Sequence, residues 1–254
     1  MPGVSVMKLP SRSTLAKVYR TVRVLGGVDS TLAALAAYVM SVPAKRGHAF
    51  DEQFGIDTTE PVGVEAGDYV DDSHRAAIWY YPSTPQVFRS VMRSLGIEPR
   101  DYVFIDIGCG KGRVLVLAGQ HPWKRVIGVE GSAPVASVAR KNLESDAVRT
   151  ALRAPVEVVT SNALSLELPP DDLLIYLYNP FSRPDVYTQF LAHLEDSLRA
   201  HPRKVILVYA GPEHRAAFDR CHYLKLLRSY ELLVEDYSWC AYTNVSYVDA
   251  AAPR

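Results

Sequence analysis

The chain has little cysteine and no excess of charge of either sign, and each shortage excludes a class of protein. Its three cysteines, Cys109, Cys221 and Cys240, are scattered and form no C-x-x-C pair, so we expect no zinc site or other metal site and no disulfide framework. The 28 basic residues balance 28 acidic ones, so no global positive field is available to hold nucleic acid or an anionic membrane. A local basic patch stays open.

Long hydrophobic runs are also missing. The longest candidate, residues 31–40, is shorter than the roughly 18 apolar residues that a membrane-spanning helix needs. The start of the chain has no basic-then-apolar layout with a convincing cleavage site, as a secretory signal would have. We therefore expect a cytoplasmic protein without a transmembrane segment. Its 254 residues, 48% of them apolar, are enough for one large or two small domains.

One stretch combines a buried strand, a glycine-rich turn and the start of a helix. Residues 102–107 form a short apolar run, and Asp106, Gly108, Gly110 and Gly112 give the pattern D-x-G-x-G-x-G before apolar residues resume at helical spacing. Glycines let the backbone approach a ligand and a helix start presents free amides, so this layout predicts a nucleotide site. A dinucleotide fingerprint needs G-x-G-x-x-G, and here the third glycine comes one residue early, which disfavours a nicotinamide oxidoreductase.

The turn Asp106-Ile-Gly-Cys-Gly-Lys-Gly112 resembles motif I of the class I S-adenosylmethionine-dependent methyltransferases. The resemblance implies that S-adenosylmethionine is the cofactor. It also implies that Gly108, Cys109, Gly110 and Gly112 approach its methionine end, while Asp106 orders the turn or receives the ammonium. As a small residue in a tight turn, Cys109 is expected to fill space and not to act as a nucleophile.

Strands and helices alternate along the second part of the chain, which indicates a mostly parallel sheet. We expect an α/β fold with a doubly wound, mostly parallel seven-stranded sheet, an antiparallel terminal strand and an N-terminal helical and lid extension. The strands are expected at residues 102–107, 126–130, 156–160, 173–178, 205–209, 230–235 and 239–247. Helices are expected to start after Thr84 with Pro85 first, after Ser132, and at a capping box of Ser182 and Asp185.

The N-terminal third differs from the rest, and we divide the chain into residues 1–83 and a methyltransferase core over residues 84–254. Residues 1–43 read as two amphipathic helices whose apolar sides pack on their own domain, with attachment to a membrane surface as the alternative. The segment Gln53-Phe-Gly-Ile-Asp-Thr58 is similar to an F-G-x-D-T segment that methyltransferases of this group fold over their site. The resemblance implies an ordered lid in place of a flexible linker.

A second resemblance precedes the first core helix. Tyr81-Pro-Ser-Thr-Pro85 is similar to the Y-x-P-T-P pattern of related methyltransferases, which implies that Tyr81 and Thr84 face the amino-acid end of the cofactor. The alternative is a helix cap beside two packed tyrosines.

Two further positions follow expected strands at the edge where ligands bind in an open α/β sheet. Glu130 ends the second strand, where a carboxylate can accept hydrogen bonds from both ribose hydroxyls. The resemblance implies that Asn162 and Ala163, after the third strand, meet the adenine, although the family more often has aspartate there. The alternative for Asn162 is an ordinary turn asparagine.

The fourth strand ends in Asn179-Pro-Phe181, which resembles the N/D-P-P-Y/F motif of amine and amide N-methyltransferases but lacks the second proline. The resemblance implies that Asn179 and Pro180 orient a nitrogen lone pair beside the cofactor and that the Phe181 ring lies over the target. The alternative is a strand that ends in a proline turn. We assign no histidine as a base.

These features together predict an S-adenosylmethionine-dependent methyltransferase that methylates an amine, either a protein lysine or a small molecule. Three alternatives remain open: an O-methyltransferase of a small metabolite, a cofactor-binding partner protein without turnover, and a nicotinamide oxidoreductase. No strong nucleic-acid signal is present.

Overall fold

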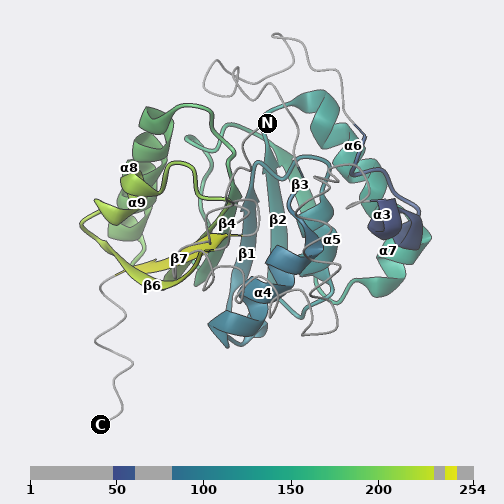
Figure 1. Ribbon diagram of the computed structural model, residues 1–254, viewed down its shortest axis with the longest axis horizontal. Coiled ribbons are helices and arrows are strands. Elements are labelled where there is room, and N and C mark those ends of the chain that lie inside the picture. Colours follow the sequence, from purple (N-terminus) through teal and green to yellow (C-terminus); the bar gives the residue numbers. More distant parts are fainter. Residues whose placement is uncertain (1–47, 61–81, 232–237, 245–254) are drawn as a thin grey trace, which may run out of the picture.

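The computed structural model describes residues 48–60, 82–231 and 238–244, which form a seven-stranded sheet with helices on both faces (Figure 1). The strand order is β3-β2-β1-β4-β5-β7-β6. The strands are β1 (Val103–Ile107), β2 (Arg125–Glu130), β3 (Val156–Thr160), β4 (Leu173–Tyr178), β5 (Val205–Ala210), β6 (Leu224–Tyr230) and β7 (Trp239–Asn244). Strands β1 to β5 are parallel, and β7 runs antiparallel to both β5 and β6. The predicted fold class is confirmed.

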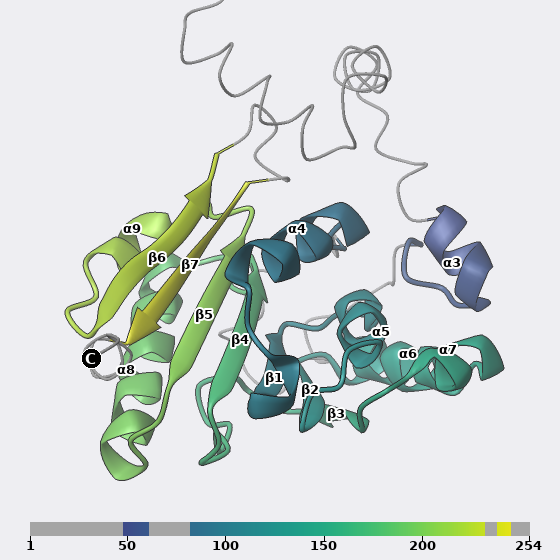
Figure 2. The same cartoon turned by 90° about the horizontal axis from the view of Figure 1, so that it is seen from below.

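Helices cover the two faces of the sheet unequally, as Figure 2 shows. On one side lie α3 (His48–Phe54), α4 (Pro85–Leu95), α5 (Arg113–Gly119), α6 (Ala133–Leu143) and α7 (Asp146–Ala151). On the other side lie α8 (Pro184–Ala200) and α9 (Arg215–Asp219), and the 3-10 turn η4 (Pro99–Asp101) precedes β1. No helix within the described ranges is long and apolar enough to cross a membrane.

Alternation along the strands separates two cores. Phe104 and Tyr176 face the side of α4, where Phe88 packs on both rings at centroid distances of 6.0 and 6.2 Å. Ile105 and Ile107 point to the opposite core, under α8. Asp106 therefore shares the α4 side of the sheet with Tyr176, its partner in the β1–β4 register.

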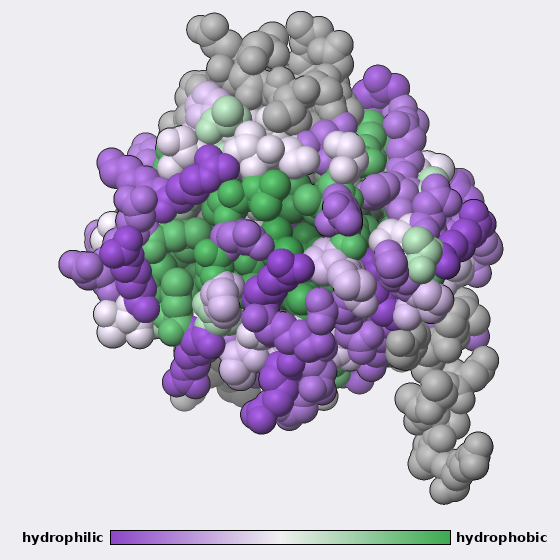
Figure 3. Space-filling model, turned by 180° about the vertical axis from the view of Figure 1, so that it is seen from behind, coloured by the Kyte–Doolittle hydropathy of each residue, from purple (hydrophilic) through white to green (hydrophobic). Residues whose placement is uncertain are grey.

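The surface seen from behind in Figure 3 gathers hydrophobic residues at its centre, inside a border of hydrophilic ones.

Strands β3 and β4 are joined by residues 161–172, which contain no helix. Leu168 of this connection is buried, and Leu164 and Leu166 pack beside it. A chain segment with spaced leucines thus covers part of the sheet where a crossover helix would otherwise lie.

The last strands and one helix start differ from the expectation. The sequence placed a strand at residues 230–235, but β6 ends at Tyr230, and residues 232–237 lie outside the described ranges. A bulge between Leu226 and Arg228 breaks the alternation of side chains along β6. Strand β6 lies at the edge of the sheet and is largely exposed, so its sequence lacks the alternating apolar pattern by which a strand is recognised.

The predicted capping box at Ser182 is also wrong, because the N-cap residue of α8 is Arg183 and makes no side-chain cap bond. The Asp185 carboxylate bonds the Arg183 guanidinium at 2.6 Å and is thereby turned away from a capping role. By contrast, α4 begins at Pro85 and ends before Gly96 at φ 60°, as expected. The expected helices of residues 1–43 lie outside the described residues.

Candidate functional site

The turn after β1 has the predicted strand–turn–helix context. Gly108, Gly110 and Gly112 all have positive φ, at 73°, 55° and 86°. Such angles strain residues with a Cβ, so the three glycines are required by the backbone path itself. The turn leads directly into α5 at the carboxyl end of the sheet, where an open α/β fold binds its ligand.

The amides of this turn have partners within the protein. Gly108 N–H and Cys109 N–H both donate to the Val129 carbonyl, at 2.8 and 3.0 Å, and Gly110 N–H donates to Glu130 Oε2 at 2.9 Å. The turn is therefore held against the end of β2. The glycines let a ligand approach the backbone closely. The sequence predicted free amides at this turn, whereas these three amides are already bonded.

Glu130 is fixed in orientation at the end of β2. Its Oε1 accepts from Ser132 N–H at 2.9 Å, while Oε2 accepts from Gly110 N–H. The predicted ribose-binding role of Glu130 stays a prediction, and this half-buried carboxylate stands where that role requires it.

Asp106 places a second acid close to Glu130. Its side chain is 3% exposed, and burial, followed by the charge of Glu130, raises the pKa of Asp106 well above its ordinary value. Burial also raises the pKa of the Cys109 thiol well above its ordinary value, with the two acids adding to the effect. The thiol therefore stays protonated, and Cys109 fills space as expected, while the acid pair favours a cationic ligand.

Thr84 lies on the α4 side of the same site. Its neighbour Ser83 bonds the Tyr176 hydroxyl at 2.5 Å, and Tyr176 pairs with Asp106 across the strands. The Thr84 hydroxyl is buried and finds no hydrogen-bond partner among the residues that the structure describes. Leaving a buried hydroxyl unsatisfied costs about 1–3 kcal/mol, so a ligand that bonds it would recover free energy. Tyr81, the other predicted residue here, lies outside the described ranges.

Ser132 was not singled out for the site by the sequence. It sits at the N-cap position of α6, yet its hydroxyl makes no cap bond and is likewise buried without a partner in the described part of the chain. Its amide already bonds Glu130. The available signal was a serine two residues after Glu130, but the sequence reasoning interpreted this serine as a helix cap.

The turn after β3 lies beside Glu130, whose carbonyl accepts from Ser161 N–H at 3.1 Å. Asn162 Oδ1 accepts from Leu164 N–H at 2.8 Å, so the side chain closes a local turn. Ala163 is 1% exposed and packs in the core under α8. The structure thus brings both residues to the expected edge, while their adenine-binding role remains a prediction.

Asn179, which follows β4, has an unusual backbone conformation and a carboxamide that is hydrogen-bonded through both its oxygen and its nitrogen. Asn179 has φ 44° and is the only non-glycine residue with positive φ in the described ranges. Tyr209 donates its hydroxyl proton to Asn179 Oδ1 at 2.6 Å, and Asn179 Nδ2 donates to the Gly211 carbonyl at 2.7 Å and to Glu213 Oε1 at 3.2 Å. Strained residues of this kind cluster at functional sites.

Pro180 brings this end of β4 against the glycine turn. A Cβ on Gly108 would lie 2.7 Å from the Pro180 Cβ, a separation that real side chains do not reach. The two motifs that the sequence singled out are therefore neighbours in space, 72 residues apart in the chain.

Phe181 does not lie at an open surface. Its ring is 1% exposed and packs on Tyr187 and Phe190 at centroid distances of 5.1 and 6.0 Å, in the core under α8. The half-buried ring of Tyr178, by contrast, lies so near Gly211 that a Cβ there would be 2.7 Å from it. Sequence reasoning missed Tyr178, because the motif places its aromatic residue after the proline.

Chemically, these groups fit S-adenosylmethionine. The cofactor carries a sulfonium and an ammonium, which suit the acid pair of Asp106 and Glu130, and hydrogen-bonding groups that suit the unsatisfied hydroxyls of Thr84 and Ser132. The absence of a side chain at Gly108 lets Pro180 pack directly against the turn.

Residues 105–175 match the family described as a methyltransferase domain. No curated protein sequence matches the chain. Solved structures with a similar fold include magnesium protoporphyrin IX methyltransferase from Synechocystis PCC 6803 with bound S-adenosylmethionine, at 17% identity, 63% of this chain, 77% of that chain and a TM-score of 0.47. Another is an S-adenosylmethionine-dependent methyltransferase from Aquifex aeolicus, at 16% identity, 62% and 88% coverage and a TM-score of 0.46.

An RNA methyltransferase from Salinibacter ruber in complex with S-adenosylhomocysteine is similar at 18% identity, 64% and 92% coverage and a TM-score of 0.44. These likenesses are distant, and the acceptors named for two of the proteins differ, a porphyrin in one and RNA in the other. We therefore take no acceptor from them. The family match covers β1 to β4 and identifies residues 105–175 as a methyltransferase domain, and the strand order and the glycine turn fit the class I S-adenosylmethionine-dependent methyltransferases that the sequence resembles.

Proposed function

We propose that the enzyme transfers the methyl group to the nitrogen of an amine, either a protein lysine or a small molecule. The observation that carries the proposal is the contact of Pro180 with Gly108, which puts the Asn-Pro pair beside the cofactor's turn. A nitrogen held by Asn179 would thus lie next to the methionine end of the cofactor.

The cofactor-binding roles follow from the same arrangement. Glu130 would accept from the ribose hydroxyls, and Asp106 would face the ammonium on the α4 side of β1. Thr84, with its unsatisfied hydroxyl, would bond the amino-acid end, and Asn162 with Ala163 would border the adenine. Bound S-adenosylmethionine supplies a methyl group that is already activated by the sulfonium.

Asn179 is well suited to orient an amine. Burial raises the pKa of Tyr209 to about 12, so its hydroxyl keeps its proton and donates it to Asn179 Oδ1. A carboxamide oxygen accepts two hydrogen bonds, so the second position can accept from an acceptor N–H and aim the nitrogen lone pair. Tyr178 would supply the aromatic face that a cationic methyl donor favours. Correct alignment can contribute roughly 7–11 kcal/mol in the best cases.

The test is a transfer assay with methyl-labelled S-adenosylmethionine on a panel that holds a lysine-rich peptide, a diamine, a phenol and a carboxylic acid. We expect label on an amine, in a product that resists base, whereas a methyl ester would be base-labile. Label found only on oxygen would contradict the proposal and favour O-methylation.

The matched variants are Asn179→Ala, Tyr209→Phe and the control Gln189→Ala, which removes an exposed carboxamide on α8. Asn179→Ala should lower kcat by about 100-fold, because misplacing the acceptor by 1 Å costs that much. Its affinity for S-adenosylhomocysteine should change little. Tyr209→Phe should lower kcat less, and the control should match wild type. Full activity of Asn179→Ala would remove the argument from this motif.

A further inference from the structure

We propose that residues 50–59, which we call the clasp, act as a positioning element of the cofactor site: the clasp binds Lys111 and Arg113 and thereby holds the glycine turn in its cofactor-binding shape. The inference rests on the cofactor site at that turn. It is independent of the acceptor and of N-methylation.

Lys111 makes the first contact. Its side chain leaves the turn between Gly110 and Gly112, is fully buried, and places Nζ 2.8 Å from Asp57 Oδ2. Partial burial acts to raise the pKa of Asp57, but the Lys111 ammonium and the amide of Glu60 outweigh it and lower that pKa below its ordinary value. A buried ammonium is costly unless paired, so this geometry is specified and not incidental.

Asn142 of α6 joins the clasp to the backbone of the turn. Its Oδ1 accepts from Asp57 N–H at 3.1 Å, and its Nδ2 donates to the Asp57 carbonyl at 2.7 Å and to the Lys111 carbonyl at 2.9 Å. One carboxamide therefore bonds both segments. Any movement of the clasp is passed to the peptide group of Lys111, inside the turn.

Arg113 makes the second contact, at the first residue of α5. Its Nε donates to Thr58 Oγ1 at 2.7 Å, and its Nη2 donates to the Thr58 carbonyl at 3.2 Å and to Thr59 Oγ1 at 2.7 Å. The Asp51 carboxylate in turn accepts from the hydroxyl and the amide of Thr58. Arg113 is 3% exposed and lies 5.9 Å from the Phe50 ring centroid.

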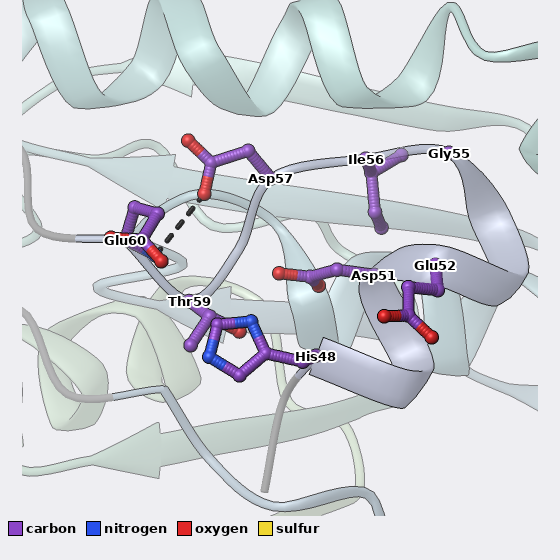
Figure 4. Close-up of a pocket in the computed structure, with 8 residues that line it drawn as sticks. All are labelled: His48, Asp51, Glu52, Gly55, Ile56, Asp57, Thr59 and Glu60. Atoms are coloured by element: carbon purple, nitrogen blue, oxygen red, sulfur yellow. Dashed lines mark hydrogen bonds between the residues drawn. The ribbon is translucent and has the colours of Figure 1, made fainter. Parts of the chain in front are cut away.

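Figure 4 shows how the segment itself is folded. The chain turns back on itself after α3, and the Glu60 amide donates to Asp57 Oδ1 at 3.2 Å, which fixes the carboxylate from the clasp side. Both basic side chains of the turn therefore meet a segment that is itself internally bonded.

The glycine turn needs such support. Its three glycines have more conformational freedom to lose than any other residues, and a cofactor that had to order them would bind less tightly. Val129 and Glu130 hold the turn from the sheet side, and the clasp holds it from the outside. The clasp thus contributes to affinity through preorganisation, without touching the cofactor.

The experiment compares Asp57→Ala with Glu60→Ala, which removes an exposed acid three residues away on the same segment. The Asp57 side chain is 52% exposed, so its replacement opens no cavity in the core. Calorimetry with S-adenosylhomocysteine should show Kd raised about tenfold for Asp57→Ala and within twofold for Glu60→Ala. Hydrogen exchange of the Gly110–Gly112 amides in the cofactor-free protein should quicken only in Asp57→Ala.

Lys111→Met and the double variant Asp57→Ala/Lys111→Met complete a double-mutant cycle. The double variant should bind no more weakly than the weaker single variant, because both changes remove the same contact. A lowered melting temperature with unchanged Kd and unchanged exchange of the turn in Asp57→Ala would reduce the clasp to a stabilising contact and overturn the inference. Wild-type protein that binds no S-adenosylhomocysteine would instead overturn the cofactor site, and the inference with it.

Discussion

Replacement of Glu130 by alanine tests the cofactor site most directly. The carboxylate is oriented by the amides of Gly110 and Ser132 and is expected to accept from two ribose hydroxyls. A hydrogen bond to a charged group contributes about 1.5–3 kcal/mol, so loss of two should weaken binding by about 3–6 kcal/mol. That free energy corresponds to a rise in Kd of roughly 10²–10⁴-fold.

Glu130→Gln gives a finer measurement, because a carboxamide keeps one acceptor oxygen and replaces the other with a donor. The new NH₂ group would face either the Gly110 or the Ser132 amide, which are both donors. Affinity should therefore fall between that of wild type and that of Glu130→Ala. The control is Glu157→Ala, which removes an exposed acid from the neighbouring strand β3 and should leave Kd within twofold.

The assay is calorimetric titration with S-adenosylhomocysteine, paired with urea unfolding of the cofactor-free protein to confirm that each variant is folded. Folded Glu130→Ala protein that binds the ligand as tightly as wild type would refute the ribose role and, with it, the way we place the cofactor on the sheet.

Gly108→Ala should be destabilised by about 1–2 kcal/mol from its positive φ alone, and by more because the new Cβ meets Pro180. Gly96→Ala is the control, since Gly96 has φ 60° but open space around it. The urea midpoint should fall further in Gly108→Ala than in Gly96→Ala. Ligand affinity should fall in Gly108→Ala alone. Asp106 predicts a pH effect: its folded pKa is raised, so the unfolded chain ionises first and stability should decline as pH rises from the ordinary aspartate pKa toward the folded one. Asp106→Asn should flatten the dependence of the urea midpoint on pH, and equal slopes would contradict this account.

The local signals in the sequence predicted most of the fold. The glycine turn, the five parallel strands and the start of α4 are encoded by neighbouring residues, and each was placed correctly. Strand β6 was not, because its bulge and exposed edge position erase the alternation that marks a strand. The partners of Lys111 and Arg113 could not be predicted, because an ion pair with Asp57 joins residues 54 positions apart.

The sequence likewise predicted some features of the site and not others. The sequence predicted that both motifs lie at the carboxyl edge of the sheet, whereas the contact of Pro180 with Gly108 depends on β1 and β4 being neighbours, which the sequence did not predict. The burial of Phe181 and the half-buried position of Tyr178 depend on how the chain turns at Asn179, which has positive φ and whose side chain bonds Tyr209 of β5 and Gly211 just after it.

The clasp has a consequence for biosynthesis. The Phe54 carbonyl bonds Ser145 across 91 positions, and Asp57 bonds Asn142 across 85, so the ribosome delivers the clasp long before its binding surface exists. At about 5–20 residues per second, translation of that stretch takes roughly 4–18 s. Throughout that interval Phe50 and Phe54, both buried in the finished enzyme, have no native surface to cover them. The clasp can therefore take its native place only after α6 and the start of α7 have emerged.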